Sequence, residues 1–187
     1  MIDKSDIKIE RLSDAEAPRF LEFADRATLR SLASVRVTGR VAVGQTYLCA
    51  VYLDRVIGCT SWYESCRRSY VDLDGVTVQP TSVYLCSSEV LPEYRGMGVG
   101  GMLYEQRLAD CSREDAPAPA LMVEILGRGT PMSVDDGARP GLVWHLAHGF
   151  EIVGYSQEED AGPVLARAVP TADASRRDAA GSRPALR

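Results

Sequence analysis

The chain has 187 residues, 45% of them hydrophobic, and a formal net charge of −5. This length and apolar content suffice for one well-filled core and are short for two domains. The negative charge argues against general nucleic-acid binding, which requires a cationic surface. No apolar stretch reaches about 18 residues, and the N-terminus lacks the charged-then-apolar pattern of a secretory signal. We therefore expect a cytoplasmic protein with no membrane partner.

Five cysteines lie scattered along the chain, at positions 49, 59, 66, 86 and 111, and none forms a Cys-x-x-Cys pair. An odd number at this spacing favours neither a disulfide framework nor a zinc site. We expect reduced thiols, most of them buried, and no bound metal.

The first predicted elements are a strand and a helix. Ile7 and Ile9 alternate with charged residues, which predicts a half-buried strand over 6–12. The capping box Ser13-x-x-Glu16 then precedes apolar residues at helical spacing. These signals predict a helix that begins near residue 14 and extends into the region 29–32.

Two hairpins are predicted next. The runs 46–53 and 56–62 are rich in β-branched and aromatic residues and are separated by Asp54-Arg55, which we interpret as a two-residue turn. Further on, Asp74-Gly75 is a strong turn signal between alternating segments. Residues 66–80 are therefore expected to form a small hairpin of their own or to extend the flanking strands.

The remaining pattern alternates strands and helices. The predicted elements are a strand over 81–90, a helix over 98–111, a strand over 120–126, a helix over 140–148, and strands over 150–155 and 164–169. The segment 170–187 contains almost no large apolar side chain, so we expect a disordered tail. The predicted organisation is one domain over 1–169 followed by this tail.

Glycines 96, 98, 100 and 101 lie at the start of the helix predicted over 98–111. Glycine lets a ligand approach the main chain without meeting a Cβ, and the first N–H groups of a helix have no intrahelical partner. The helix dipole and the charge of Arg95 both favour an anion at this position. The run therefore predicts a binding site for an anion, namely the phosphates of a pyrophosphate.

A dinucleotide-binding fingerprint is the first interpretation to weigh. Gly96-x-Gly98-x-x-Gly101 has its spacing, and Glu124 lies at roughly the distance of a ribose-binding acid. That fingerprint requires its first glycine directly after the first strand of a βαβ unit. Here the segment 92–95 intervenes, and most of the preceding chain is predicted to form other elements, so we reject this interpretation.

The residues before the glycines carry a more specific resemblance. Val90-Leu91-Pro92-Glu93-Tyr94-Arg95-Gly96-Met97-Gly98-Val99-Gly100, after the apolar run 83–86, resembles the acetyl-CoA-binding motif of the GNAT acyltransferases. The resemblance implies that the arginine and glycine amides hold the CoA pyrophosphate, and that the strand end over 88–90 pairs with the pantetheine arm. The implied cofactor-binding residues are Ser88, Val90, Arg95, Gly96, Met97, Gly98, Val99, Gly100 and Gly101.

A second stretch, 144–154, is similar to the GNAT pattern in which a short helix ends in Gly-Phe-Glu-x-Val-Gly. The resemblance therefore spans roughly residues 5–169. It implies an α+β fold of the GNAT type, with a central mixed, mostly antiparallel twisted sheet of about seven strands flanked by about four helices.

The resemblance also implies a reaction: an amine attacks the thioester of acetyl-CoA directly, and a base takes the amine proton. A backbone N–H near Val90 would stabilise the oxyanion. The resemblance makes Glu124 the first candidate base, because it lies on the strand after the 98–111 helix, where some GNAT members place a glutamate beside the amine. It is also the only charge in a predicted buried strand. Glu89 is the second, although strand alternation turns it away from the face of Val90. Tyr84 and Cys86 share the parity of Val90, so we expect them to line the acceptor pocket.

The sequence departs from the GNAT pattern at two places. His145 stands where many members have a tyrosine that protonates the leaving thiolate; an imidazolium could serve instead, and a helical histidine without a catalytic role is the alternative. The segment 127–140 is longer than the family connection and replaces an asparagine common there. Loops of this length are often functional, and Asp135-Asp136 could bind a cationic group.

The resulting hypothesis is an acyltransferase that moves an acetyl group from acetyl-CoA to a primary amine of a small molecule. An acidic body suits a cationic acceptor. Two alternatives stay open: a non-catalytic acyl-CoA-binding sensor module, and an N-acetyltransferase acting on a protein or peptide. The sequence leaves the acceptor, the acyl length and the oligomeric state undetermined, a homodimer included.

Overall fold

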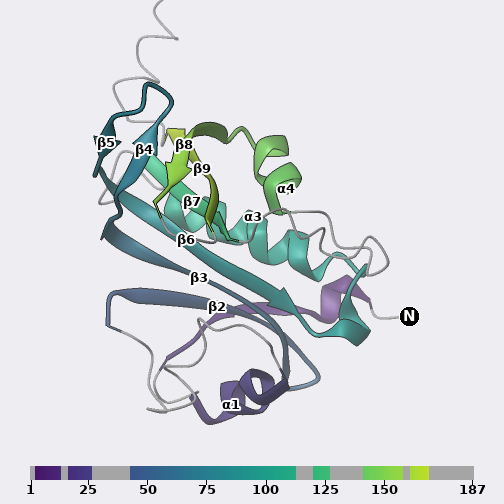
Figure 1. Cartoon of the computed structure of the whole chain (residues 1–187). Helices are drawn as coiled ribbons and strands as arrows, with labels where there is room; N and C mark the ends of the chain where they lie inside the picture. Colours follow the sequence, from purple (N-terminus) through teal and green to yellow (C-terminus); the bar gives the residue numbers. More distant parts are fainter. Residues whose placement is uncertain are drawn as a thin grey trace, which may run out of the picture.

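The computed structural model describes residues 3–13, 17–26, 43–112, 120–126, 141–157 and 161–168. Within these ranges the chain forms nine strands, three α-helices and two short 3-10 turns (Figure 1). In chain order they are η1 (Lys4–Asp6), β1 (Lys8–Arg11), α1 (Ala17–Arg26), β2 (Gln45–Tyr52), β3 (Arg55–Arg67), β4 (Tyr70–Asp72), β5 (Thr77–Val78), β6 (Thr81–Val90), η4 (Pro92–Tyr94), α3 (Val99–Cys111), β7 (Ala120–Leu126), α4 (Gly141–Ala147), β8 (Glu151–Ser156) and β9 (Ala161–Ala168).

All of these strands belong to one sheet, in the order β1-β2-β3-β6-β7-β9-β8-β4-β5. Every neighbouring pair is antiparallel except β6 and β7, which run parallel. The predicted α+β class with a mostly antiparallel mixed sheet is thus confirmed. The described part of the chain has nine strands where about seven were expected, because the two short strands β4 and β5 join the sheet beyond β8.

The hairpin predicted within residues 66–80 is confirmed as β4 and β5. Gly75 takes a left-handed conformation in its turn, with φ of 81°, and the Asp72 side chain accepts the backbone N–H of Asp74 at 3.0 Å and of Val76 at 2.8 Å. The hairpin lies at the far end of the long β3–β6 pair and returns to β8, where Val71 opposes Tyr155 (Figure 1).

Gly154 permits this return, and its replacement by alanine gives a stability prediction. A Cβ on Gly154 would lie 2.2 Å from the carbonyl oxygen of Val71, a backbone atom that cannot turn aside. We expect Gly154→Ala to lower the free energy of unfolding by about 1–3 kcal/mol through overpacking, measured by urea denaturation. Gly101→Ala is the control, because its Cβ would meet nothing within 4 Å; equal stability of the two variants would contradict the prediction.

The β2–β3 hairpin is confirmed, but its turn lies one residue earlier than predicted. Leu53 and Asp54 both have positive φ, 47° and 60°, while Arg55 already pairs with Tyr52 in the ladder. The prediction of Asp54-Arg55 was wrong because Leu53, an unusual residue at positive φ, projects into solvent with 76% exposure and does not pack.

The helix predicted after the first strand is confirmed over Ala17–Arg26. Its capping box and the continuation to 29–32 lie outside the described residues. Phe20, Phe23 and Ala24 are completely or almost completely buried at helical spacing, and they form the apolar face that covers one side of the sheet.

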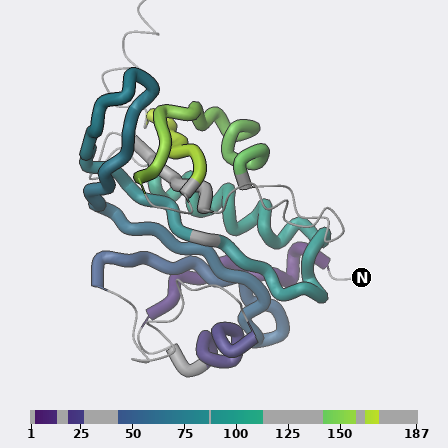
Figure 2. Tube along the Cα trace, viewed as in Figure 1, coloured from purple at the N-terminus to yellow at the C-terminus, as the bar shows by residue number. Residues whose placement is uncertain are grey.

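The sheet carries a core on each face, as alternate residues of β2 demonstrate. Leu48 and Ala50 pack in one cluster with residues of α3, whereas Tyr47, Cys49 and Val51 pack in a second cluster with residues of α1. Successive side chains of a strand point to opposite faces, so α1 and α3 cover opposite faces of the sheet (Figure 2).

None of the helices in the described ranges combines the length and the apolar character that crossing a membrane requires. The segment 127–140 and the tail 170–187, for which a loop role and disorder were predicted, lie outside those ranges.

Candidate functional site

Strand β6 separates from β7 at the centre of the sheet. The two strands pair only near the start of β6, at Val83 with Leu121 and Tyr84 with Met122. On its other edge β6 stays paired to β3 as far as Val90, opposite Gly58. From Leu85 onward, the edge of β6 that faces away from β3 therefore has no strand beside it among the described residues.

A β-bulge marks the point of separation. Thr60 opposes Ser88 and Trp62 opposes Leu85, so β6 has one more residue than β3 over this interval. The Oγ atoms of Thr60 and Ser88 lie 2.6 Å apart across the pair. An extra residue on one strand bends that strand and interrupts the ladder of hydrogen bonds. The end of β6 therefore runs in a different direction from its start.

The bulge also reverses which side chains share a face. Val90 packs in the α3 cluster together with Val83 and Leu85, whereas Tyr84 and Cys86 pack in a third cluster around Val164. The expectation that Tyr84 and Cys86 share the face of Val90 was therefore wrong. An inserted residue shifts the two-residue period of a strand by one.

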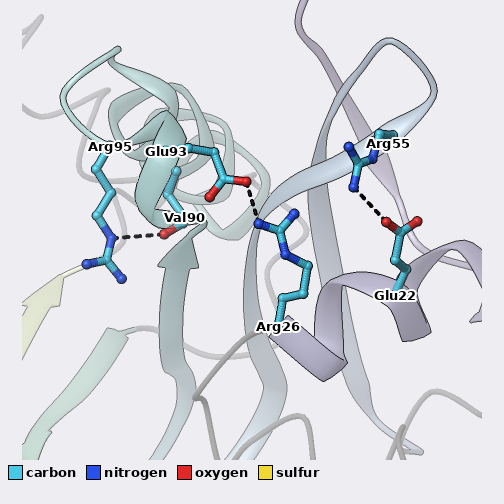
Figure 3. A network of polar contacts seen from close by, with 6 residues as sticks. All are labelled: Glu22, Arg26, Arg55, Val90, Glu93 and Arg95. Atoms are coloured by element: carbon cyan, nitrogen blue, oxygen red, sulfur yellow. Dashed lines mark hydrogen bonds and ion pairs between the residues drawn. The ribbon is translucent and has the colours of Figure 1, made fainter.

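The backbone of Val90 points into the open edge. The N–H of the next residue, Leu91, donates to the carbonyl of Ile57 on β3 at 2.9 Å. In an antiparallel pair successive residues direct their N–H and C=O groups to opposite sides, so those of Val90 face away from β3. Its carbonyl accepts Nε–H of Arg95 at 3.0 Å (Figure 3).

The turn after β6 leads directly into the N-terminus of α3. Gly96 and Gly98 have positive φ, 74° and 85°, a region that favours glycine. The first intrahelical bond from Met102 N–H reaches the carbonyl of Gly98 at 3.1 Å, so the preceding N–H groups have no partner within the helix. A Cβ at Gly96 would meet no atom within 4 Å. The backbone is accessible to a ligand there.

The side chain of Lys4 extends over Gly98, a contact that was not predicted from the sequence. Its Nζ and Cε atoms lie 2.7 and 2.8 Å from the position that a Cβ on Gly98 would take. Lys4 belongs to η1, before β1, and no local motif connects it with a position so distant in sequence. A second cation, besides Arg95, is thus held at the start of α3.

Two ion pairs connect this turn and the β2–β3 turn to α1. Arg26 pairs with Glu93, and Arg55 pairs with Glu22 at 2.7 Å (Figure 3). The hydrogen bond from Arg26 lowers the pKa of Glu93. Glu93 is directed to α1 whereas Arg95 is directed to the open edge of β6, so the 92–95 turn presents its cation, and not its acid, at that edge.

His145 lies on α4, buried against α3. Its Nδ1 and the hydroxyl of Tyr104 lie 2.6 Å apart, and 8% of the residue is exposed. Burial, with the nearby charges of Arg107 and His148, lowers the pKa of His145 to about 4. The ring is therefore neutral at neutral pH, which corrects the expectation of an imidazolium acid.

The buried imidazole predicts a pH-dependent stability. The pKa of His145 is about 4 in the folded protein against 6.5 for an ordinary histidine, so the unfolded chain binds an extra proton in this window. Stability is complete above pH 6.5 and falls as the pH drops toward 4. We expect His145 to contribute a loss of about 2 kcal/mol between about pH 7 and 5.

Urea denaturation of His145→Gln at both pH values checks this, because the variant should lose that part of the pH dependence. Val143→Ala, at an exposed position of the same helix, is the control, because it leaves both histidines in place. An identical pH dependence in the wild type and in His145→Gln would contradict the prediction.

The arrangement can be compared with known proteins. No protein-family model and no curated protein matches the sequence. Solved structures do match. The ribosomal-protein-S18-alanine N-acetyltransferase from Escherichia coli has a TM-score of 0.59 at 13% identity, over 96% of this chain and 99% of that chain. An acetyltransferase of the GNAT family from Streptococcus pneumoniae has a TM-score of 0.56 at 12% identity, over 88% and 99%. Arabidopsis thaliana Naa50, in complex with the bisubstrate analogue CoA-Ac-MVNAL, has a TM-score of 0.51 at 17% identity, over 87% and 99%.

The chain has the GNAT fold.

Within this GNAT fold, the residues predicted to bind the cofactor lie together at the end of β6 and the start of α3. Met97 is exposed, whereas the side chain of Val99 is buried in the core, so Val99 can offer a ligand only its backbone.

The two candidate bases, Glu89 and Glu124, lie on neighbouring strands, β6 and β7. Glu89 is buried and opposes Cys59, which packs on the α1 face. Glu89 thus lies on the face opposite Val90, as strand alternation predicted. Glu124 lies on β7, the strand from which β6 separates, opposite Val164. The side chain of Glu124 is outside the described part of the chain.

Proposed function

We propose that the protein is an N-acetyltransferase that uses acetyl-CoA as its co-substrate and acts in the cytoplasm. One observation carries the proposal: the open edge of β6 leads directly into positive-φ glycines at a helix N-terminus. An open strand edge can pair with an extended, amide-containing arm, and helix N–H groups bind phosphate. The open edge of β6 and the glycines at the α3 N-terminus are direct neighbours, just as the pantetheine arm and the pyrophosphate are neighbours in CoA.

The residues present fit that ligand. The N–H groups of the 96–101 segment would hold the pyrophosphate, with the guanidinium of Arg95 and the ammonium of Lys4 supplying charge. The backbone of Ser88 and Val90 would pair with the pantetheine arm, since the N–H and C=O of Val90 point away from β3. The thioester would then lie beyond Ser88, beside the bulge.

The proposed reaction is direct transfer. The amine nitrogen attacks the thioester carbonyl carbon, a C–N bond forms, the C–S bond breaks, and CoA leaves as a thiolate. Glu124 accepts the proton of the amine. With the thioester beside the bulge, a backbone N–H of β6 next to the bulge, rather than one at Val90, stabilises the negative charge that develops on the thioester oxygen.

We propose that water protonates the departing thiolate rather than His145, whose neutral imidazole is far too weak an acid for that step. The hydrogen bond of His145 with Tyr104 orients the ring, and the pKa of His145 near 4 removes the imidazolium from neutral solution. Turnover should accordingly show no titration of this histidine between about pH 6 and 8, where an ordinary histidine would titrate.

For the acceptor we propose a primary amine on a small molecule. Two similar structures point to larger acceptors: the Escherichia coli protein acts on an alanine of ribosomal protein S18, and the Arabidopsis protein is in complex with the bisubstrate analogue CoA-Ac-MVNAL. A panel that contains small amines and peptides therefore decides the acceptor class. Higher kcat/KM with peptides would replace the small-molecule proposal.

Calorimetric titration with acetyl-CoA, with NADH as the control ligand, tests the cofactor. Saturable binding of acetyl-CoA alone supports the proposal, and a preference for NADH refutes it. Release of free CoA thiol in the presence of amines then separates an enzyme from a sensor module, which would bind CoA and release no thiol.

Lys4 provides a prediction for the phosphate end of the site. Replacing Lys4 by glutamate puts a negative charge over Gly98, so we expect the dissociation constant of acetyl-CoA to rise about 10-fold or more through loss of a charge-assisted contact. The measurement is calorimetry at low ionic strength. Lys8→Glu makes the same charge change at an exposed residue of β1 and should leave affinity within about twofold. Equal weakening by both would indicate only a general charge effect.

A further inference from the structure

Arg107 lies in the interior of the molecule, on α3, with 1% of its surface exposed. Its Nη1 donates to the backbone carbonyl of Cys86 at 2.8 Å. The guanidinium carbon lies 5.1 Å from the ring centroid of Tyr104, whereas the Nε–H is buried and makes no hydrogen bond. No carboxylate forms an ion pair with Arg107 among the described side chains.

Such a cation is expensive for folding. Burying a charge without a counter-charge carries a large desolvation cost, and a contact with an aromatic ring offsets only part of it. Arg107 occupies the core face of α3 together with Leu103 and Leu108, where leucine or methionine would fill the space at no electrostatic cost. Stability therefore does not explain an arginine at this position.

Arg107 contacts the backbone of β6 at an irregular point of this strand. Cys86 lies within the bulge of β6, between Leu85 and Ser88, where this strand has its extra residue. This is also where β6 has already left β7, whose pairing ends at Tyr84. A bulged strand without a neighbour on one edge lacks the ladder that would otherwise hold its backbone. Arg107 supplies a rigid, charged donor to that backbone from the helix.

We propose that Arg107 is a positioning residue for acyl transfer, which acts through the Cys86 carbonyl to hold the β6 bulge and hence the backbone that receives the thioester. The inference rests on the proposed function. If pyrophosphate binds at 95–101 and the pantetheine arm runs back along Val90 and Ser88, the reacting thioester lies next to the bulge. Arg107 itself touches no substrate.

This role and a purely structural one differ in what they predict for Arg107→Met. A structural role predicts a less stable protein. Positioning predicts a folded protein whose free energy of unfolding is unchanged or higher, because an uncompensated buried charge has been removed. It also predicts that the pyrophosphate end of the site is intact while the thioester is held poorly.

The test compares Arg107→Met and Arg107→Lys with Arg167→Met. The last is a matched control, because Arg167 also donates to a backbone carbonyl, that of His148, at 3.2 Å and away from β6. For Arg107→Met we expect kcat to fall at least about 10-fold while the dissociation constant of CoA stays within about threefold. Arg107→Lys, which keeps a charged donor, should restore part of kcat, and Arg167→Met should keep all of it.

Amide hydrogen exchange in the ligand-free protein provides a readout that does not depend on activity. Exchange over residues 85–90 should accelerate about 10-fold or more in Arg107→Met and not in Arg167→Met. Unchanged exchange, a kcat within twofold of the wild type, or a variant that unfolds without denaturant would each overturn the inference. A wild-type protein that binds no acetyl-CoA would overturn the proposed function instead, and the exchange data would still decide whether Arg107 holds the bulge.

Discussion

Replacing Gly98 with valine is expected to weaken acetyl-CoA binding by at least about 10-fold, or roughly 1.4 kcal/mol. Gly98 has a φ of 85°, which a β-branched residue rarely adopts. Its side chain would also enter the space between the α3 N-terminus and Lys4, since a Cβ there lies 2.7 Å from Nζ. Both effects close the approach to the N–H groups that would hold the pyrophosphate.

Calorimetric titration of acetyl-CoA measures the loss of affinity. Gly44→Val is the matched control, because Gly44 also has a positive φ, 75°, with nothing within 4 Å of its Cβ position. Its backbone strain is comparable, but it lies before β2 and far from α3 in sequence. Affinity that is unchanged in Gly98→Val, in a protein that remains folded, would remove the basis for placing the cofactor at these glycines.

Replacing Glu124 with glutamine is expected to lower kcat at neutral pH by about 10²–10⁴-fold, the usual contribution of a general base. Glutamine has nearly the same shape and cannot accept the proton of the amine. The dissociation constant of acetyl-CoA should stay within about twofold, because the base acts on the acceptor and not on the cofactor. Steady-state kinetics across pH, together with calorimetry, provide the two measurements.

Two further glutamine variants make the result interpretable. Glu151→Gln removes an exposed carboxylate at the start of β8 and should leave turnover unchanged. Glu89→Gln removes the buried carboxylate on the α1 face of β6. A loss of turnover in Glu89→Gln with none in Glu124→Gln would transfer the role of base to Glu89. Unimpaired turnover of both variants at every pH would indicate that the proton leaves through water.

Much of the fold could be predicted because its signals are local. The strand predicted over 81–90 and the strand predicted over 120–126 coincide with β6 and β7. The helix predicted to begin at Gly98 has that residue as its N-cap. Apolar periodicity and the preferences of glycine and proline for turns and helix ends depend on residues only a few positions apart, so they can be recognised directly in the sequence. The phosphate-binding glycines belong to the same class of signal.

The wrong predictions concern places where an irregular backbone interrupts the regular pattern of a strand or its turn. The turn at Leu53 and Asp54 was displaced by one residue, since nothing in the local sequence favours leucine at positive φ. The bulge before Ser88 was not foreseen, and it reversed the facing expected for Tyr84 and Cys86. A one-residue insertion leaves no mark in composition, yet it moves every following side chain to the other face.

The sequence by itself determined the element order and the cluster of glycines at the start of α3, and its resemblance to the GNAT pattern implied the mostly antiparallel α+β class. Only the tertiary structure decided that Lys4 lies over Gly98, that His145 is hydrogen-bonded to Tyr104 and neutral, and that Arg107 holds the carbonyl of Cys86. The physical reason is distance along the chain. Local backbone preferences act between near neighbours, whereas burial and the shift of a pKa depend on groups that only the folded sheet and helices bring together.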